Sequence, residues 1–145
     1  MKSLPYYKEE GGAEFSGAIS LIQNIDVLTP DEALMIANYM CSCIVIDEWL
    51  SNIKDVLSNK LVIPSQTWSD GFYVWDASHI HYVREYHARL PVEFVAHVKR
   101  KLECRFDPHI LNKEYKNLSD SIFHAAKNHV SLYPNSITSA YIVKN

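Results

Sequence analysis

The chain contains little glycine, and this scarcity argues against one large group of enzymes. Only four glycines occur among 145 residues, and none lies in a Gly-x-Gly or Gly-Lys-Ser/Thr pattern. Glycine-rich loops of these kinds let backbone N–H groups approach a phosphate closely. The sequence therefore predicts no nucleotide-driven chemistry.

Cysteine is equally rare. The three cysteines, Cys41, Cys43 and Cys104, cannot form a complete disulfide set, and the first two are too close for an easy bridge. We expect all three to be reduced core or helix residues. A nucleophilic cysteine needs a positive environment that lowers its thiol pKa. The neighbours of Cys41 and Cys43 are apolar and instead predict buried, inert thiols.

Long apolar runs and clustered positive charge are also missing. No run approaches the roughly 18 apolar residues of a membrane helix, and the first ten residues lack the apolar centre of a secretory signal. Seventeen acidic against fourteen basic residues give a net charge of −3, whereas nucleic-acid binding needs a clustered basic surface. We therefore expect a cytoplasmic protein that binds neither membrane nor nucleic acid, folded as a single domain over residues 1–145.

Histidine is present, but not in the spacing of a metal site. Zinc sites bring three or four ligands together, commonly through tight local pairs. His79 and His81 are two residues apart and diverge on a helix, and His124 and His129 are five apart. The sequence thus predicts no metal and no cofactor, with the seven histidines partly exposed on helix flanks.

Adjacent carboxylates are a second group of candidate catalytic residues. Asp47-Glu48 and Glu9-Glu10 would serve acid–base catalysis only if burial separated their pKa values. Paired acids at a helix start more often interact with the helix dipole. We identify no catalytic residue, and the sequence favours a protein that is not an enzyme.

Apolar periodicity and capping residues predict an α+β fold that is mostly helical, with about five helices. Thr29-Pro-Asp-Glu32 is the clearest start, since Thr can be the N-cap and Pro the first helical residue. The helices are drawn from the segments with helical spacing at 13–25, from Thr29 onward, 47–58, 77–87, 91–103 and 112–130.

A small antiparallel sheet or hairpin is predicted around residues 61–75. Gln66–Trp68 and Phe72–Trp75 flank Ser69-Asp70-Gly71, where Gly accepts positive φ and the Asp carboxylate can cap the turn. Leu61–Ile63 reads as a short edge strand that ends at Pro64.

Three further segments complete the expected organisation. The run from Cys43 to Ile46 fits either a strand or a helix. Residues 1–12 suggest a loosely held lead-in, and Ile137–Val143 has the composition of a late strand.

The aromatic residues of the hairpin allow two interpretations. In a strand, Tyr73 and Trp75 share one face while Phe72 and Val74 take the other. Exposed Trp and Tyr side chains near acids are typical anchors of protein interfaces. Alternatively, helices cover both faces of the hairpin and the aromatic residues belong to the core.

Three short motifs follow one another through the middle of the chain. They are Ser69-Asp70-Gly71-Phe72-Tyr73-Val74-Trp75, then Tyr82-Val83-Arg84-Glu85-Tyr86-His87, then Leu90-Pro91-Val92-Glu93-Phe94-Val95. Their order resembles that of small bacterial immunity proteins from contact-dependent inhibition and related polymorphic toxin systems. The resemblance covers about thirty residues, and Ser69 stands where Thr is more usual in that pattern.

The resemblance implies a cytoplasmic immunity protein that binds the C-terminal toxin domain of a neighbour's effector and blocks its active site or substrate surface. Acids would pair with a basic toxin surface, and aromatic anchors would slow release. The candidate contact residues are Asp47, Glu48, Asp55, Trp68, Asp70, Tyr73 and Trp75. The alternatives are a small His-dependent metal enzyme and a housekeeping protein-interaction module, such as a homodimeric adaptor. The toxin's activity and the oligomeric state stay open.

Overall fold

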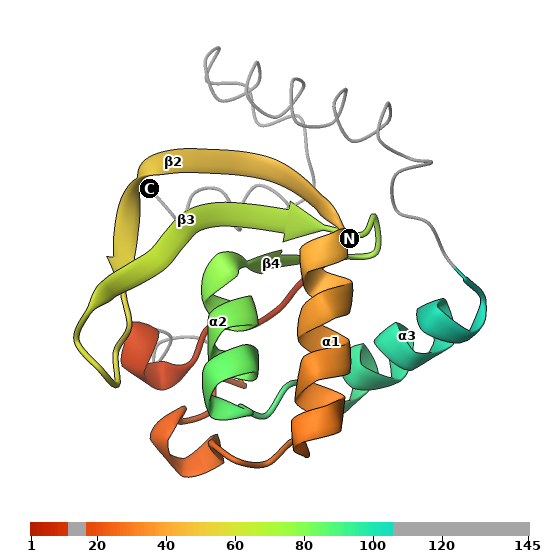
Figure 1. Cartoon of the computed structure of the whole chain (residues 1–145), viewed down its shortest axis with the longest axis horizontal. Coiled ribbons are helices and arrows are strands. Elements are labelled where there is room, and N and C mark those ends of the chain that lie inside the picture. Colours follow the sequence, from red (N-terminus) through yellow and green to blue (C-terminus); the bar gives the residue numbers. More distant parts are fainter. Residues whose placement is uncertain (12–16, 106–145) are drawn as a thin grey trace.

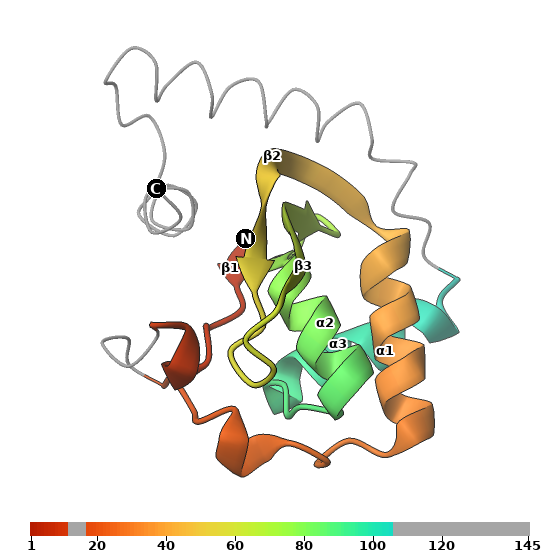
Figure 2. The ribbon, with the colours of Figure 1, turned by 60° about the vertical axis from the view of Figure 1, so that its left-hand side comes forward.

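The structure, a computed structural model, describes residues 1–11 and 17–105. These residues form a four-stranded mixed sheet in the order β1-β4-β3-β2. The sheet arches over α1 and α2, which lie side by side, while α3 packs behind them (Figure 1, Figure 2). The elements are β1 (Lys2–Ser3), η1 (Lys8–Glu10), η3 (Ile22–Asn24), α1 (Pro30–Ser42), β2 (Ile44–Lys54), β3 (Leu61–Ser69), β4 (Tyr73–Asp76), α2 (Ala77–Tyr86) and α3 (Val92–Glu103).

The helix expected after Thr29 is confirmed as α1. Thr29 is its N-cap and accepts a hydrogen bond from the Glu32 N–H, and Pro30 occupies the first turn, where its missing N–H costs nothing. The predicted apolar face, including Ile36 and Met40, is fully buried. The helices predicted at 77–87 and 91–103 are confirmed as α2 and α3 within one residue at each end.

The predicted hairpin is also confirmed. β3 and β4 are antiparallel, and Trp68 pairs with Trp75. Gly71 has a φ of 92°, a conformation that glycine adopts without strain. The Asp70 carboxylate accepts the N–H groups of Phe72 and Tyr73, both at 2.9 Å, and so caps the turn as expected.

The predicted mostly helical fold with about five helices is wrong. The part of the chain that the structure describes has three α-helices and a sheet of four strands. Within the described part of 13–25, the expected helix is replaced by the single turn η3. The helix expected at 112–130 and the strand expected at Ile137–Val143 lie outside the described residues.

The main cause of this error is strand β2. The segment 47–58 has apolar residues at helical spacing, yet its first part is the second half of an eleven-residue strand paired with β3. The undecided run before Asp47 is its beginning, because Ile44 and Ile46 are buried while Val45 between them is exposed. Leu61–Ile63 is the start of the nine-residue β3, an interior strand that continues through Pro64.

The first residues are part of the fold and not a loose lead-in. β1 runs parallel to β4, with Lys2 opposite Tyr73. Leu4 and Tyr7 are buried, Leu4 in the main core and Tyr7 in a second cluster. The chain therefore fixes its beginning against the hairpin at its centre.

The main core lies between the sheet and the helices. Trp75 contributes the largest side chain that is fully buried and meets Phe94 of α3 with ring centroids 5.6 Å apart. A second cluster gathers Leu21, Ile63 and Tyr82 where α2 meets the far end of β3. None of the helices in the part of the chain described here is long and apolar enough to cross a bilayer.

Candidate functional site

Asp70 is the centre of the most deeply buried polar cluster. Its Oδ2 accepts hydrogen bonds from the Tyr39 hydroxyl and from His97 Nε2, both at 2.6 Å. Asp70 is fully buried, and His97 is only 6% exposed. Burial, and then the hydrogen bond to Asp70, raise the pKa of Tyr39, so its hydroxyl stays a donor. The carboxylate therefore ties the hairpin turn to α1 and α3.

Asp55 is the centre of a second cluster, at the turn between β2 and β3. Its Oδ1 accepts the N–H groups of Leu57 and Ser58, and its Oδ2 accepts His81 Nε2 at 2.7 Å and the Tyr86 hydroxyl at 2.8 Å. Although burial acts to raise the pKa of Asp55, the hydrogen bond from His81 and the other donors hold it well below its usual range.

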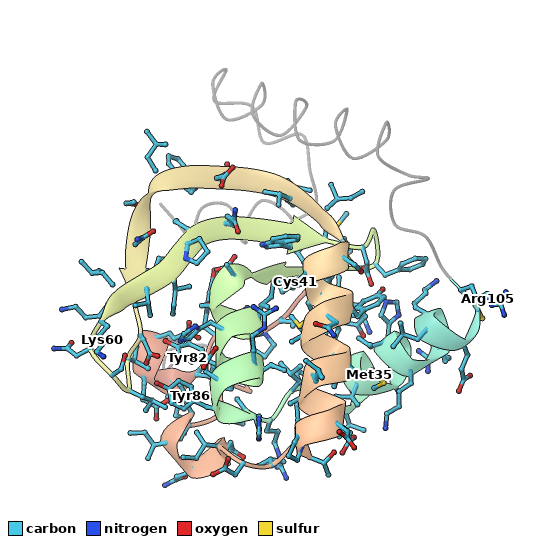
Figure 3. The ribbon with its side chains drawn as sticks, viewed as in Figure 1. Met35, Cys41, Lys60, Tyr82, Tyr86 and Arg105 are labelled. Atoms are coloured by element: carbon cyan, nitrogen blue, oxygen red, sulfur yellow. The ribbon has the colours of Figure 1, made fainter. Side chains whose placement is uncertain are left out.

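Helix α2 supplies the partners of this turn. Figure 3 shows Tyr82 and Tyr86 projecting from α2 toward the turn that carries Lys60. The Tyr82 hydroxyl accepts the Val56 N–H at 3.1 Å. The hydrogen bonds thus fasten the β2–β3 turn to the helix.

Asp76 is the centre of the third cluster, at the junction of β4 and α2. Its carboxylate accepts the Tyr6 hydroxyl at 2.6 Å and the Thr67 hydroxyl at 3.3 Å. The Asp76 N–H donates to His79 Nδ1, and His79 Nε2 lies 3.0 Å from the Pro5 carbonyl oxygen. These two bonds assign the His79 proton to Nε2.

The three aspartate clusters, centred on Asp55, Asp70 and Asp76, correct the expectation for the histidines. His79 and His97 are buried, not partly exposed on helix flanks. Each bonds to groups of the fold. Within the described ranges 1–11 and 17–105, no group of three or more His, Cys, Asp or Glu side chains is placed to hold a metal ion.

The cysteines are free, and the burial expected for Cys43 is confirmed. Cys43 is 4% exposed, and burial, followed by the nearby Asp70 charge, raises its thiol pKa to about 12. A thiol with this pKa is protonated at neutral pH and is a poor nucleophile. Cys41 is half-buried, and its sulfur accepts from Arg84 at 2.9 Å.

The structure divides the seven candidate contact residues into interior and accessible groups. Asp55, Asp70 and Trp75 are buried, and each contacts other parts of the same chain. Tyr73 is half-buried against Phe94, with ring centroids 5.1 Å apart. Trp68, Asp47 and Glu48 complete the candidate set.

Trp68 is half-buried and packs between the two core clusters. Asp47 is half-buried and Glu48 is exposed, and both lie on β2. These two acids therefore form the most accessible part of the predicted contact set.

Two apolar side chains adjoin these acids. Trp49 is 48% exposed, and Leu50 is fully exposed. The pairing of β2 with β3 shifts between Trp49 and Asn52, an irregularity that leaves Leu50 without an opposite residue. Such bulges redirect side chains at sheet edges. We call Asp47, Glu48, Trp49 and Leu50 the β2 surface.

Hydrogen bonds hold the polar groups of the β2 surface in place. Trp49 Nε1 donates to Asp47 Oδ2 at 3.1 Å, and Gln66 Nε2 donates to Glu48 Oε1 at 2.7 Å. Neither carboxylate forms an ion pair with a Lys, Arg or His of the described segments. The β2 surface therefore combines apolar area with two carboxylates that have no ion-pair partner among residues 1–11 and 17–105.

Sequence reasoning found the acids of this surface but missed Trp49 and Leu50. The expected helix at 47–58 contains no strand irregularity of the kind that exposes Leu50. The available signal was the β-branched and aromatic composition of Ile44–Trp49, which favours a strand.

No protein-family model, no curated protein and no solved structure matches the chain.

Proposed function

We propose that the protein is an immunity protein that binds a cognate toxin domain in the cytoplasm and blocks its active site or substrate surface. The proposed contact is the β2 surface. The motif resemblance between residues 69 and 95 supports the class of protein, and the exposed side chains of β2 support the place of contact.

The observation that carries this proposal is the adjacent exposure of Trp49 and Leu50. Both side chains leave apolar area in water, which is unfavourable until another surface covers it. Tryptophan is among the residues that dominate binding energy when they enter a pocket on a partner. The two side chains therefore supply an anchor without any rearrangement of the core.

The charge of the β2 surface indicates the chemistry of the partner. Asp47 and Glu48 have no cationic partner within the described residues, so a positively charged surface would complement them. A toxin that acts on nucleic acid carries such a surface, because it must bind phosphate groups. Covering that surface would exclude the substrate.

Co-expression tests the proposal directly. The partner is the C-terminal domain of the large secreted protein expected to be encoded immediately upstream of this gene. We expect the wild-type chain to restore growth of cells that produce this domain and to co-purify with it. Trp49→Ala should weaken binding at least tenfold, because truncating a central tryptophan anchor costs about 2 kcal/mol or more. Binding is measured by calorimetry.

A matched pair of leucine variants controls for the contact surface. Leu50→Ser should weaken binding, whereas Leu34→Ser, on an exposed position of α1, should leave it unchanged. If the toxin still kills and the two proteins never co-purify, the immunity function is wrong. If they bind but Trp49→Ala and Leu50→Ser have no effect, the β2 surface is not the contact. Binding without rescue would instead indicate a general interaction module.

A further inference from the structure

A cavity of about 580 Å³ lies between the N-terminal segment, the segment 17–28 and the start of α3. Its walls are mainly apolar, and they include Ile19, Leu28, Val95 and Ala96. The volume is in the range of small-molecule sites, roughly 300–1,000 Å³. No side chain of residues 1–11 or 17–105 fills this space, which makes it a candidate site for an apolar ligand.

The charge in the lining has a single sign. Among the described lining residues, the charged side chains are Arg89 and Lys99, both positive, in a chain whose net charge is −3. The hydroxyls of the two lining tyrosines are already used: Tyr6 donates to Asp76, and Tyr7 donates to the Arg89 carbonyl at 2.7 Å. A charged group on a ligand in this cavity would therefore contact Arg89 and Lys99.

Two backbone hydrogen bonds hold the main chain of Arg89 in place beside the cavity. Its N–H donates to the Asn24 carbonyl at 2.9 Å, and its carbonyl accepts from Tyr7. Its guanidinium has no hydrogen-bonding or ionic partner within residues 1–11 and 17–105. This exposed guanidinium can therefore offer its planar pair of donors to a carboxylate.

Lys99 can also be recruited. It pairs with Glu32 at 3.4 Å, and both side chains are well exposed. Exposed pairs of this kind contribute little and exchange readily for another anion. Val92 and Val27 add exposed apolar area beside the cations, and Val92 is 83% exposed.

From this combination we propose that the cavity binds a small amphipathic carboxylate, with its apolar body against the walls and its carboxylate on Arg89 and Lys99. Medium-chain fatty acids have this chemistry. The site is independent of the proposed toxin contact, because it shares no residue with the β2 surface.

Decanoate is the probe that tests this site, with decyltrimethylammonium as a ligand of equal chain length and opposite charge. Binding to the full chain is measured by calorimetry up to 1 mM ligand. We expect saturable binding of one decanoate per chain, at least ten times tighter than that of the cation. Absence of decanoate binding, or equal binding of the cation, would overturn the proposal.

Substitutions place the ligand in the cavity. Arg89→Ala should weaken decanoate binding at least fivefold and Arg89→Lys less. Arg100→Ala, at an exposed arginine of α3 that does not line the cavity, should have no effect. Ala96→Phe should fill the cavity and abolish binding, and its folding is checked by circular dichroism. Val92→Asp, at an exposed position, should repel the carboxylate without disturbing the core. Equal losses in Arg89→Ala and Arg100→Ala, or unchanged binding in Ala96→Phe or Val92→Asp, would exclude this cavity.

Discussion

Asp70 joins parts of the chain that are far apart in sequence through a single carboxylate. One oxygen caps the hairpin turn, and the other accepts from Tyr39 of α1 and His97 of α3. A buried carboxylate is costly unless donors surround it, and four donors do so here. At the scale of single residues, the Asp70 carboxylate therefore fixes how the hairpin turn packs against α1 and α3.

Removing one of the four groups that donate a hydrogen bond to Asp70 tests this role. Tyr39→Phe keeps the ring but removes the hydroxyl, and we expect a loss of about 1.5–3 kcal/mol in the free energy of unfolding, since the bond is made to a charged group. Tyr73→Phe is the matched control, because no hydrogen bond from its hydroxyl occurs within the described part of the chain. Urea denaturation measures both, and equal stability of Tyr39→Phe and wild type would contradict the role.

The sequence could reveal part of this residue-scale design. The order Asp-Gly between two segments of strand composition predicted both the turn and its cap by Asp70. It could not reveal that the same carboxylate is buried, because its other donors come from 31 residues before and 27 residues after it. Local spacing contains no information on such long-range contacts, so Asp55 and Asp70 were expected at a partner's surface.

At the scale of elements, helices with capping signals were predictable and strand β2 was not. Thr29-Pro30 marks a start whatever surrounds it. β2 has alternating burial only near its beginning, and from Glu48 to Asn52 both faces are exposed. A strand without a buried face lacks the period-two pattern, so its apolar residues can match a helix by chance.

β1 is the shortest element of the sheet, and it gives a prediction at this scale. Leu4 follows β1 directly and is 4% exposed in the main core. We expect Leu4→Ala to lower the free energy of unfolding by about 2–3 kcal/mol, as for other buried leucines. Lys2→Ala, at an exposed position of the same strand, should change it by less than about 0.5 kcal/mol. Guanidinium denaturation measures the free energy of unfolding of both variants. If both match wild type, the segment at β1 does not stabilise the fold.

For the whole molecule, the lowered pKa of Asp55 links stability to pH. The native state binds a proton at Asp55 less readily than the unfolded chain does, so the stabilising contribution is complete above about pH 4, the ordinary pKa of aspartate. It is lost as the pH falls through the lower native pKa. The molecule should therefore lose stability in acid.

Asp55→Asn tests this linkage. We expect the variant to be less stable than wild type by about 2 kcal/mol or more at pH 7, because charged hydrogen bonds are lost. The difference should shrink between pH 4 and pH 2, where wild type loses the same contribution. Thermal melts over this range measure it, and Glu103→Gln, at an exposed position, should follow wild type. A difference that stays constant with pH would refute the linkage.

The bulge of β2 has a consequence for how the molecule can diversify. Glu48, Trp49 and Leu50 belong to none of the hydrophobic clusters formed by the described residues. Exchanging these three side chains therefore leaves the interior intact, and one scaffold can carry a repertoire of interchangeable specificities. Under the proposed immunity function, protection against a different toxin would require a few codon changes in β2 and no new fold.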